Sequence, residues 1–486
     1  MLAPIMQSID VCFHYFFVPN RLIMDNWEKF ITNGENGRFA PLEGNGVYPV
    51  TSHQFSSFGD VIKPGQLADY FNFPTFTDPE STPGNYYKVD WMPFRAYNLI
   101  YNEYYRDQNL EAPLPVPKGD VNNAFQYEDA DGIMKTATFR DLMTLRYRSY
   151  KKDYFTSALP WTQRGPQVLI PMGTKGNLVY SDTGQTKIVN ADTGGVPPNG
   201  NIASDMGNPA ISGNGTPVNI DVSENHVVET ENIDGTINDL RTAFKVQEWL
   251  ERNARGGARY IEQLFSHFGV RSSDARLQRP EYLGGTKAPV VISDITQTSQ
   301  TSDNSELGEQ AGQATSLSNS YVFNRRFEEH GWIIGLMSIM PRASYYQGYP
   351  RKFNRRSFLD FYFPEFSHLG EQAIKNEELF YNPVLTGANK DGAENVGTFG
   401  YTPRYAEYRF NNDEIHGEFR SSLNFWHMGR QFANLPKLNK EFISTNDDSI
   451  YRPFSVTNQN EEHCYCQIYQ DIQATRLIPR YGTPEL

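Results

Sequence analysis

The stretch that decides the fold is residues 9–19, IDVCFHYFFVP. Polar and apolar side chains alternate and then give way to an apolar run, which is the pattern of a β-strand with one face in a hydrophobic core. Pro19 ends the pattern because proline has no backbone N–H to donate to a sheet. The strand starts close to residue 1, so two alternatives stay open: Met1 is the natural start, or a preceding arm is missing.

Further strands are predicted in the second half of the chain, at residues 332–340, 358–363, 405–410 and 464–472. Turn residues separate these runs. Many short strands far apart in the sequence favour a sandwich or jelly roll, since a doubly wound sheet would need regular alternation of helices and strands.

Helices are predicted to be few. The spacing of aromatic residues indicates short helices at residues 20–31 and 94–107. Tyrosines recur at helical spacing in the second of these, and we interpret them as core or interface packing. A longer helical insertion is expected over residues 236–268, opened by a capping-box pattern at Thr236, interrupted at Gly256 and ended at Gly269.

Two segments differ from the rest in composition. Residues 165–235 are rich in Gly, Asn, Thr, Asp and Pro, with no long periodic run, and are predicted to be a surface insertion made of hairpins. Residues 296–320 are rich in Ser, Thr, Gln and Gly and are predicted to be a polar surface arm.

Composition limits the function. With 38% hydrophobic and 21% charged residues, the 486-residue chain can build a folded core. A formal charge of −13 argues against a surface that neutralises nucleic acid everywhere, so any DNA contact must be local. Three cysteines form no disulfide framework, and the longest apolar run, residues 331–341, is too short to cross a membrane. An aromatic content of 14% indicates extensive protein–protein contact.

Common catalytic motifs are missing from the sequence. It contains no GxxxxGK[ST], HExxH, GxSxG or CxxC pattern, which lowers the expectation of an enzyme. His463, Cys464 and Cys466 are the nearest approach to a ligand cluster, but in a strand His463 would face away from both cysteines. We therefore predict no metal and no cofactor.

Basic residues nevertheless cluster in two aromatic-rich segments. They are Arg146, Arg148, Lys151 and Lys152 in the first, and Arg351, Lys352, Arg355 and Arg356 in the second. Interleaved cations and rings are typical of grooves for single-stranded nucleic acid, in which cations follow phosphates and rings stack on bases. The alternative is salt bridges and cation–π packing within or between subunits.

Two strings in the sequence are specific enough to indicate a family: residues 93–110, PFRAYNLIYNEYYRDQNL, and residues 14–22, HYFFVPNRL. They resemble the major capsid proteins of the Microviridae, especially those of the gokushovirus and pichovirus-like branches. Shorter matches follow in the family's order: residues 26–30, 153–161, 279–285, 329–335, 370–372 and 404–409.

The resemblance implies an all-β, eight-stranded antiparallel jelly roll with large inserted loops and a few short helices, forming one domain over residues 1–486. It implies a non-enzymatic subunit of a T=1 icosahedral virion shell, assembled in the bacterial host cytoplasm around a circular single-stranded DNA genome. Residues 165–235 would then be the variable insertion that forms protrusions at the threefold axes and serves host attachment.

The resemblance also implies partners, and two alternative functions stay open beside it. The partners are other copies of the chain, a small basic DNA-packaging protein, a pilot protein, an internal scaffold and a host receptor, with no membrane insertion. The rivals are a carbohydrate-binding, lectin-like jelly roll and a glycosidase-like enzyme, which would need two carboxylates facing one cleft.

Overall fold

The computed structural model describes residues 1–32, 52–54, 63–75, 88–118, 124–128, 134–168, 176–180, 187–190, 202–205, 208–211, 218–221, 226–230, 237–301, 306–384, 392–445, 448–456 and 461–476. The chain divides into two compact units. The first comprises Met1–Thr162 and Gly256–Leu486, and the second is Gln163–Arg255. The predicted insertion, residues 165–235, lies within the second unit.

The first unit is organised around a three-stranded antiparallel sheet, in which β1 (Ile9–Pro19) lies between β12 (Glu281–Pro289) and β15 (Gly331–Pro341). The strand predicted over residues 9–19 is therefore confirmed, and it is the central one. Its register pairs Ile9 with Pro341 and Pro19 with Gly331, and a bulge interrupts the β12 side between Tyr15 and Phe16.

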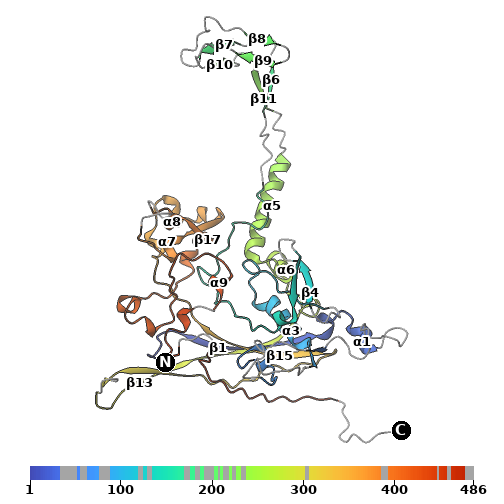
Figure 1. Cartoon of the computed structure of the whole chain (residues 1–486), viewed down its shortest axis with the longest axis vertical. Coiled ribbons are helices and arrows are strands. Elements are labelled where there is room, and N and C mark those ends of the chain that lie inside the picture. Colours follow the sequence, from blue (N-terminus) through green and yellow to red (C-terminus); the bar gives the residue numbers. More distant parts are fainter. Residues whose placement is uncertain are drawn as a thin grey trace. The chain divides into compact units, whose positions relative to one another are not determined.

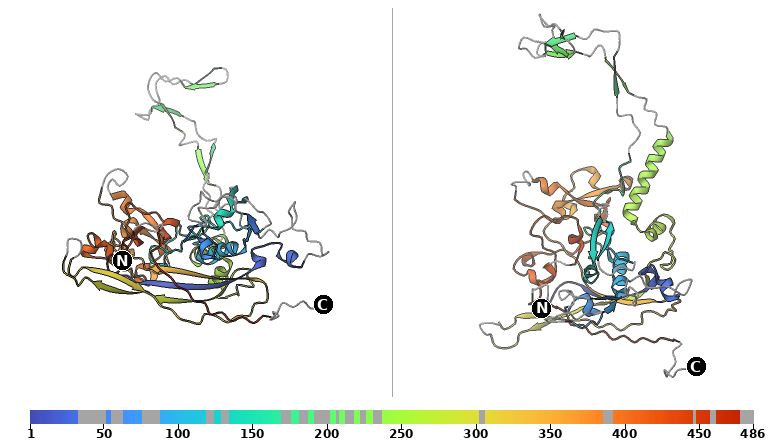
Figure 2. Two further views of the ribbon diagram at one scale, coloured as in Figure 1. Left: turned by 60° about the horizontal axis from the view of Figure 1, so that its bottom comes forward. Right: turned by 45° about the vertical axis from the view of Figure 1, so that its right-hand side comes forward.

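One face of this sheet is covered by a helix, α3 (Met92–Ile100), whose place against the strands is visible in Figures 1 and 2. Phe16, Val18 and Ile334 from the sheet pack against Met92 and Ile100, and all five are at most 5% exposed. A π-helical turn, Tyr101–Tyr105, continues α3. The helix predicted over residues 94–107 is thus confirmed, and its first two tyrosines are buried as expected.

The remaining strands of the first unit form two-stranded pairs. They are β2 (Ser52–Gln54) with β3 (Lys88–Asp90), β4 (Ala124–Glu128) with β5 (Met134–Thr138), β13 (Val291–Thr296) with β14 (Gln310–Thr315), and β16 (Glu371–Lys375) with β17 (Thr398–Pro403). The described chain is thus rich in antiparallel strands, and its largest sheet has three of them.

Most helices of the first unit are short. They are α1 (Trp27–Thr32), α2 (Leu67–Tyr70), α4 (Phe139–Leu142), α6 (Tyr260–Phe268), α7 (Asn376–Leu379), α8 (Ala393–Val396) and α9 (Lys440–Ile443). As predicted, α6 stops at Gly269, which takes the left-handed φ of 68° that ends helices. Short 3-10 turns cover Asn20–Leu22, Arg351–Phe353, Phe358–Asp360, Pro364–His368, Ala406–Tyr408, Gly417–Arg420, Asn424–Trp426 and Asp448–Ile450.

The second unit is a series of nested antiparallel pairs followed by a helix. The pairs are β6 (Gly176–Tyr180) with β11 (His226–Thr230), β7 (Lys187–Asn190) with β10 (Val218–Asp221), and β8 (Ile202–Asp205) with β9 (Asn208–Ile211). The chain thus runs out through three strands and returns through three, which confirms hairpins in this segment. The helix α5 (Ile237–Gly256) follows; the predicted cap, Thr236, lies outside the described residues.

Three strand predictions fail. Residues 358–363 begin with a 3-10 turn, because Asp360 accepts backbone hydrogen bonds from Arg356 and Ser357 at 2.9 and 2.8 Å. Residues 405–410 also bend into a 3-10 turn, since Tyr405 adopts a left-handed φ of 60°. Residues 464–472 pair with no strand of the described chain.

Candidate nucleic-acid interface and the adjoining pocket

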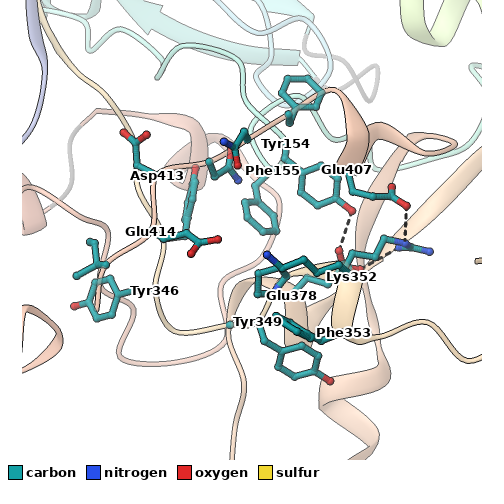
Figure 3. Close-up of a pocket in the computed structure, with 18 of the residues that line it drawn as sticks. Tyr154, Phe155, Tyr346, Tyr349, Lys352, Phe353, Glu378, Glu407, Asp413 and Glu414 are labelled. Carbon is teal, nitrogen blue, oxygen red and sulfur yellow. Dashed lines mark hydrogen bonds and ion pairs between the residues drawn. The ribbon is translucent and has the colours of Figure 1, made fainter. Parts of the chain in front are cut away.

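The second basic segment borders a pocket in the first unit. The cavity, about 660 Å³, is lined by the segments 345–355 and 407–416 together with Tyr154 and Phe155. Figure 3 shows rings and carboxylates facing the cavity from these separate segments. Of the four cations predicted in this segment, Arg351, Lys352 and Arg355 line the pocket.

Arg351 forms the best-buried ion pair of this pocket. Its Nη1 lies 3.1 Å from Oε1 of Glu378 and donates to the Ala373 carbonyl at 2.7 Å, while its Nε lies 3.8 Å from Glu407. Tyr154 donates its hydroxyl hydrogen to the other Glu378 oxygen at 2.8 Å. The side chains of Arg351 and Glu378 are 15% and 2% exposed. Arg351 is therefore occupied within its own chain.

The electrostatics of this pair follow from its burial. Burial raises the pKa of Glu378, and although Arg351 acts in the opposite direction, the net shift is upward. Burial would lower the pKa of Arg351, but the nearby Glu378 carboxylate holds it above its ordinary value. The carboxylate and the guanidinium thus depend on each other to stay charged inside the protein.

Among the described residues, none of the other three cations of this segment forms an ion pair as buried as that of Arg351. Arg355 donates to the Tyr408 hydroxyl at 2.7 Å, and its guanidinium lies over the rings of Phe361 and Tyr408 at 5.3 and 5.4 Å. Arg356 is 68% exposed and 3.5 Å from Glu377. Lys352 is exposed above its neighbour Phe353, and the structure gives it no ion pair with a described residue. Lys352 is the cation of this segment best placed for an outside partner.

The first basic segment likewise contains cations bound to groups of the same chain and an exposed cation, Lys151. Arg146 donates to the Asp141 carbonyl, and Arg148 donates to Ser338 at 2.7 Å and lies over the Tyr105 ring. Lys152 is paired with Asp107. Burial alone would raise the pKa of that carboxyl, but Lys152 and two backbone N–H groups hold it below its ordinary value. Lys151 is exposed and, within the described chain, in no ion pair.

The two basic segments meet only in part. Tyr345 donates to Asp153 at 2.9 Å, and Tyr154 reaches Glu378, so residues 151–155 adjoin the pocket. Arg148, in contrast, is directed towards β15 through Ser338. The structure therefore does not gather all eight cations of the two basic segments on one surface.

Sequence reasoning missed two partners. Glu378 was not singled out because its link to Arg351 and Tyr154 spans residues far apart in the sequence. Arg430, 2% exposed, lies within 5.0 Å of the rings of Tyr150, Phe432 and Phe442. A lone arginine among apolar residues carries no signal of such stacking in the sequence.

The described residues offer neither a metal-binding cluster nor a membrane-spanning helix. Within the described ranges, no group of three His, Cys, Asp or Glu side chains is arranged to hold a metal ion. His463 lies 2.8 Å from the Val456 carbonyl. No helix of the described chain has the length and apolarity that a membrane crossing needs.

Comparison with known proteins decides the family. Residues 1–486 match the family described as capsid protein (F protein). The chain belongs to this capsid protein family. Capsid protein VP1 of Chlamydia phage 1 is 34% identical over 100% of this chain and 88% of its own length. VP1 of Bdellovibrio phage phiMH2K is 35% identical, covering 99% and 86%, and VP1 of Spiroplasma virus 4 is 29% identical, covering 100% and 87%.

These relatives confirm the resemblance to microvirus capsid proteins. All three are named as capsid proteins, so the chain is a structural capsid protein of a virion and not an enzyme. The hypothesis of a glycosidase-like enzyme is thereby excluded, and a capsid role replaces the lectin-like hypothesis as the main function. Shell formation implies contact with further copies of the same chain.

Proposed function

We propose that this capsid protein self-assembles into a small T=1 icosahedral shell that encloses a circular single-stranded DNA genome. The observation that carries the proposal is the family match over the whole chain. Closed shells of one repeated subunit follow from heterologous contacts arranged by symmetry, in which many weak contacts become stable together. Assembly would take place in the bacterial host cytoplasm.

The experiment is to express the chain and to examine native lysate by sedimentation and negative-stain electron microscopy. The expected result is particles of uniform diameter containing the 55.5 kDa chain and DNA. A chain that stays monomeric in the native host lysate contradicts the proposal.

For the fold, we propose a single eight-stranded jelly roll over residues 1–486 that carries insertions. The three-stranded sheet and the antiparallel pairs support this, since a jelly roll is built from such strands. Residues 165–235 would be a surface insertion at the threefold axes, residues 236–268 a helical insertion and residues 296–320 a polar arm. Hairpins without a large sheet in the first of these suit a protrusion that presents loops for host attachment to a receptor.

Genome contact is proposed for Lys151 and Lys352, the exposed lysines of the two basic segments that have no ion pair with a described residue. Lys151 and Lys352 are exposed, whereas Arg351 is held by Glu378 and Arg356 lies 3.5 Å from Glu377. A chain of net charge −13 cannot neutralise a genome by itself. A small basic DNA-packaging protein would supply the remaining charge, and a pilot protein and an internal scaffold complete the proposed partners.

The test removes charge without disturbing the fold. Lys151→Ala, Lys352→Ala and their combination should lower the fraction of DNA-filled particles, measured as the absorbance ratio at ~260 and ~280 nm across a sucrose gradient. The matched control is Lys245→Ala, which removes the same charge from α5, where the lysine pairs with Glu248. Normal DNA content in the double variant would assign these lysines to the surface or to contacts between subunits.

A further inference from the structure

An exposed aromatic patch follows the second basic segment. Six large rings are 48–72% exposed. They are Phe353, Phe358, Phe361, Tyr362, Phe363 and Tyr408. Apolar rings at this density are unusual on a surface that faces only water.

The rings form connected clusters. The ring centroids of Tyr362 and Tyr408 are 5.9 Å apart, and the Arg355 guanidinium lies over the rings of both Tyr408 and Phe361. The rings of Phe358 and Phe363 both pack against Phe366, with ring centroids 5.9 and 5.7 Å apart. Phe353 lines the same pocket as Arg355 and Tyr408. The rings of the patch thus form two clusters carried mainly by one stretch of chain, the first around Arg355 and Tyr408 and the second around Phe366.

The backbone beneath the patch is held in place. Arg404 donates to the Leu359 carbonyl at 2.6 Å, and Tyr405 donates to the Phe361 carbonyl at 2.8 Å. Ser357 and Asp360 form a capping box at the start of the 3-10 turn. These bonds hold the backbone that carries the rings, so ordering of this segment costs little conformational entropy when a partner binds.

The area suits a macromolecular partner. With about 200 Å² per aromatic side chain and roughly 60% exposure, six rings offer ~700 Å². A standard protein–protein interface takes ~800 Å² from each partner, and an ordinary monomer exposes patches of ~300–600 Å².

We propose that the aromatic patch is a contact with a second copy of this chain in the assembled particle. The inference rests on the proposed shell function and names one of its contact surfaces. The edge of the patch carries both an exposed cation, Arg356, and an exposed anion, Glu365. A surface with both charges suits another copy of the same acidic chain better than DNA, whose phosphates would be repelled by Glu365.

Photo-crosslinking in purified particles tests the contact. Phe358, 69% exposed, is replaced by p-benzoylphenylalanine, and intact particles are irradiated and separated on a denaturing gel. The expected product is a covalent dimer at twice 55.5 kDa that is absent when particles are dissociated before irradiation. A crosslink to DNA or to a chain of another mass overturns the inference, as does an intact particle that gives only single chains.

Substitution gives a second readout. Phe358→Asp should lower particle yield by about tenfold or more, as expected for an interface hot spot, while Phe358→Leu keeps an apolar side chain and should assemble within about twofold of the parent. Both unassembled subunits should show the circular dichroism of the parent, because the side chain is outside the core. Equal yields for Asp and Leu overturn the inference, whereas failure of the unchanged chain to form particles overturns the proposed function itself.

Discussion

Replacing Arg351 by alanine removes the cation that faces a buried carboxylate. Glu378 is 2% exposed, and without Arg351 it keeps two hydrogen bonds, from Tyr154 at 2.8 Å and from the Lys375 backbone N–H at 2.9 Å. Removing one partner of a buried ion pair costs about 3–5 kcal/mol. Because two hydrogen bonds remain, we expect the lower end, ~3 kcal/mol at pH 7.

The penalty should depend on pH. Burial already raises the pKa of Glu378 in the parent. A carboxyl with a raised folded pKa keeps its proton where the unfolded chain has lost it, so its contribution to stability falls as pH rises above its ordinary value. Removing Arg351 takes away the group that opposes this shift. The loss of stability in Arg351→Ala should therefore be smaller at pH 5 than at pH 7.

The assay is urea unfolding of the unassembled subunit at both pH values. Arg351→Ala combined with Glu378→Gln should recover at least half of the loss, since a neutral amide needs no counter-ion. The control is Arg342→Ala, whose pair with Asp413 is 59% and 43% exposed and should contribute less than ~1 kcal/mol. Equal losses at pH 5 and pH 7, or no recovery in the double variant, would refute the reasoning.

Two further substitutions test the core and the pocket wall. Phe16→Ala deletes a ring that is 1% exposed between the sheet and α3, and should cost ~3–5 kcal/mol in the same urea assay; a loss below ~1 kcal/mol contradicts the packing. Gly348→Ala would place a Cβ 2.3 Å from the Glu378 carbonyl oxygen, a backbone atom that cannot swing away, so a loss of ~1–3 kcal/mol is expected; an unchanged urea midpoint would show that the loop moves freely.

The parts of the fold that the sequence predicted correctly are those whose pattern is local. The alternation in residues 9–19 predicted β1, the tyrosine spacing predicted a helix over residues 94–107, where α3 and the π-helical turn lie, and Gly269 is the predicted end of α6. These predictions succeed because hydrophobic periodicity and helix caps are properties of neighbouring residues.

The parts that failed depend on contacts outside the pattern. Residues 358–363 are as aromatic as a strand, but Asp360 and Ser357 bind the local backbone and turn it. Nothing in the sequence indicated the pairing of Arg351 with Glu378, because the carboxylates elsewhere in the chain have no recognisable spacing from the basic segments. Composition can place a cation in a segment but cannot show what neutralises it.

The position of β1 between β12 and β15 also determines when the nascent chain can complete its central sheet. Ile9 pairs with Pro341, so β1 cannot complete its sheet until β15, 332 residues later in the chain at this pair, has been synthesised. At ~5–20 residues per second, that interval is roughly 17–70 s, and β12 is the only one of the two neighbours that can pair with β1 before it ends. A truncated chain that ends before β15 would lack one neighbour of its central strand. A subunit that ends before residue 331 therefore cannot complete its central three-stranded sheet.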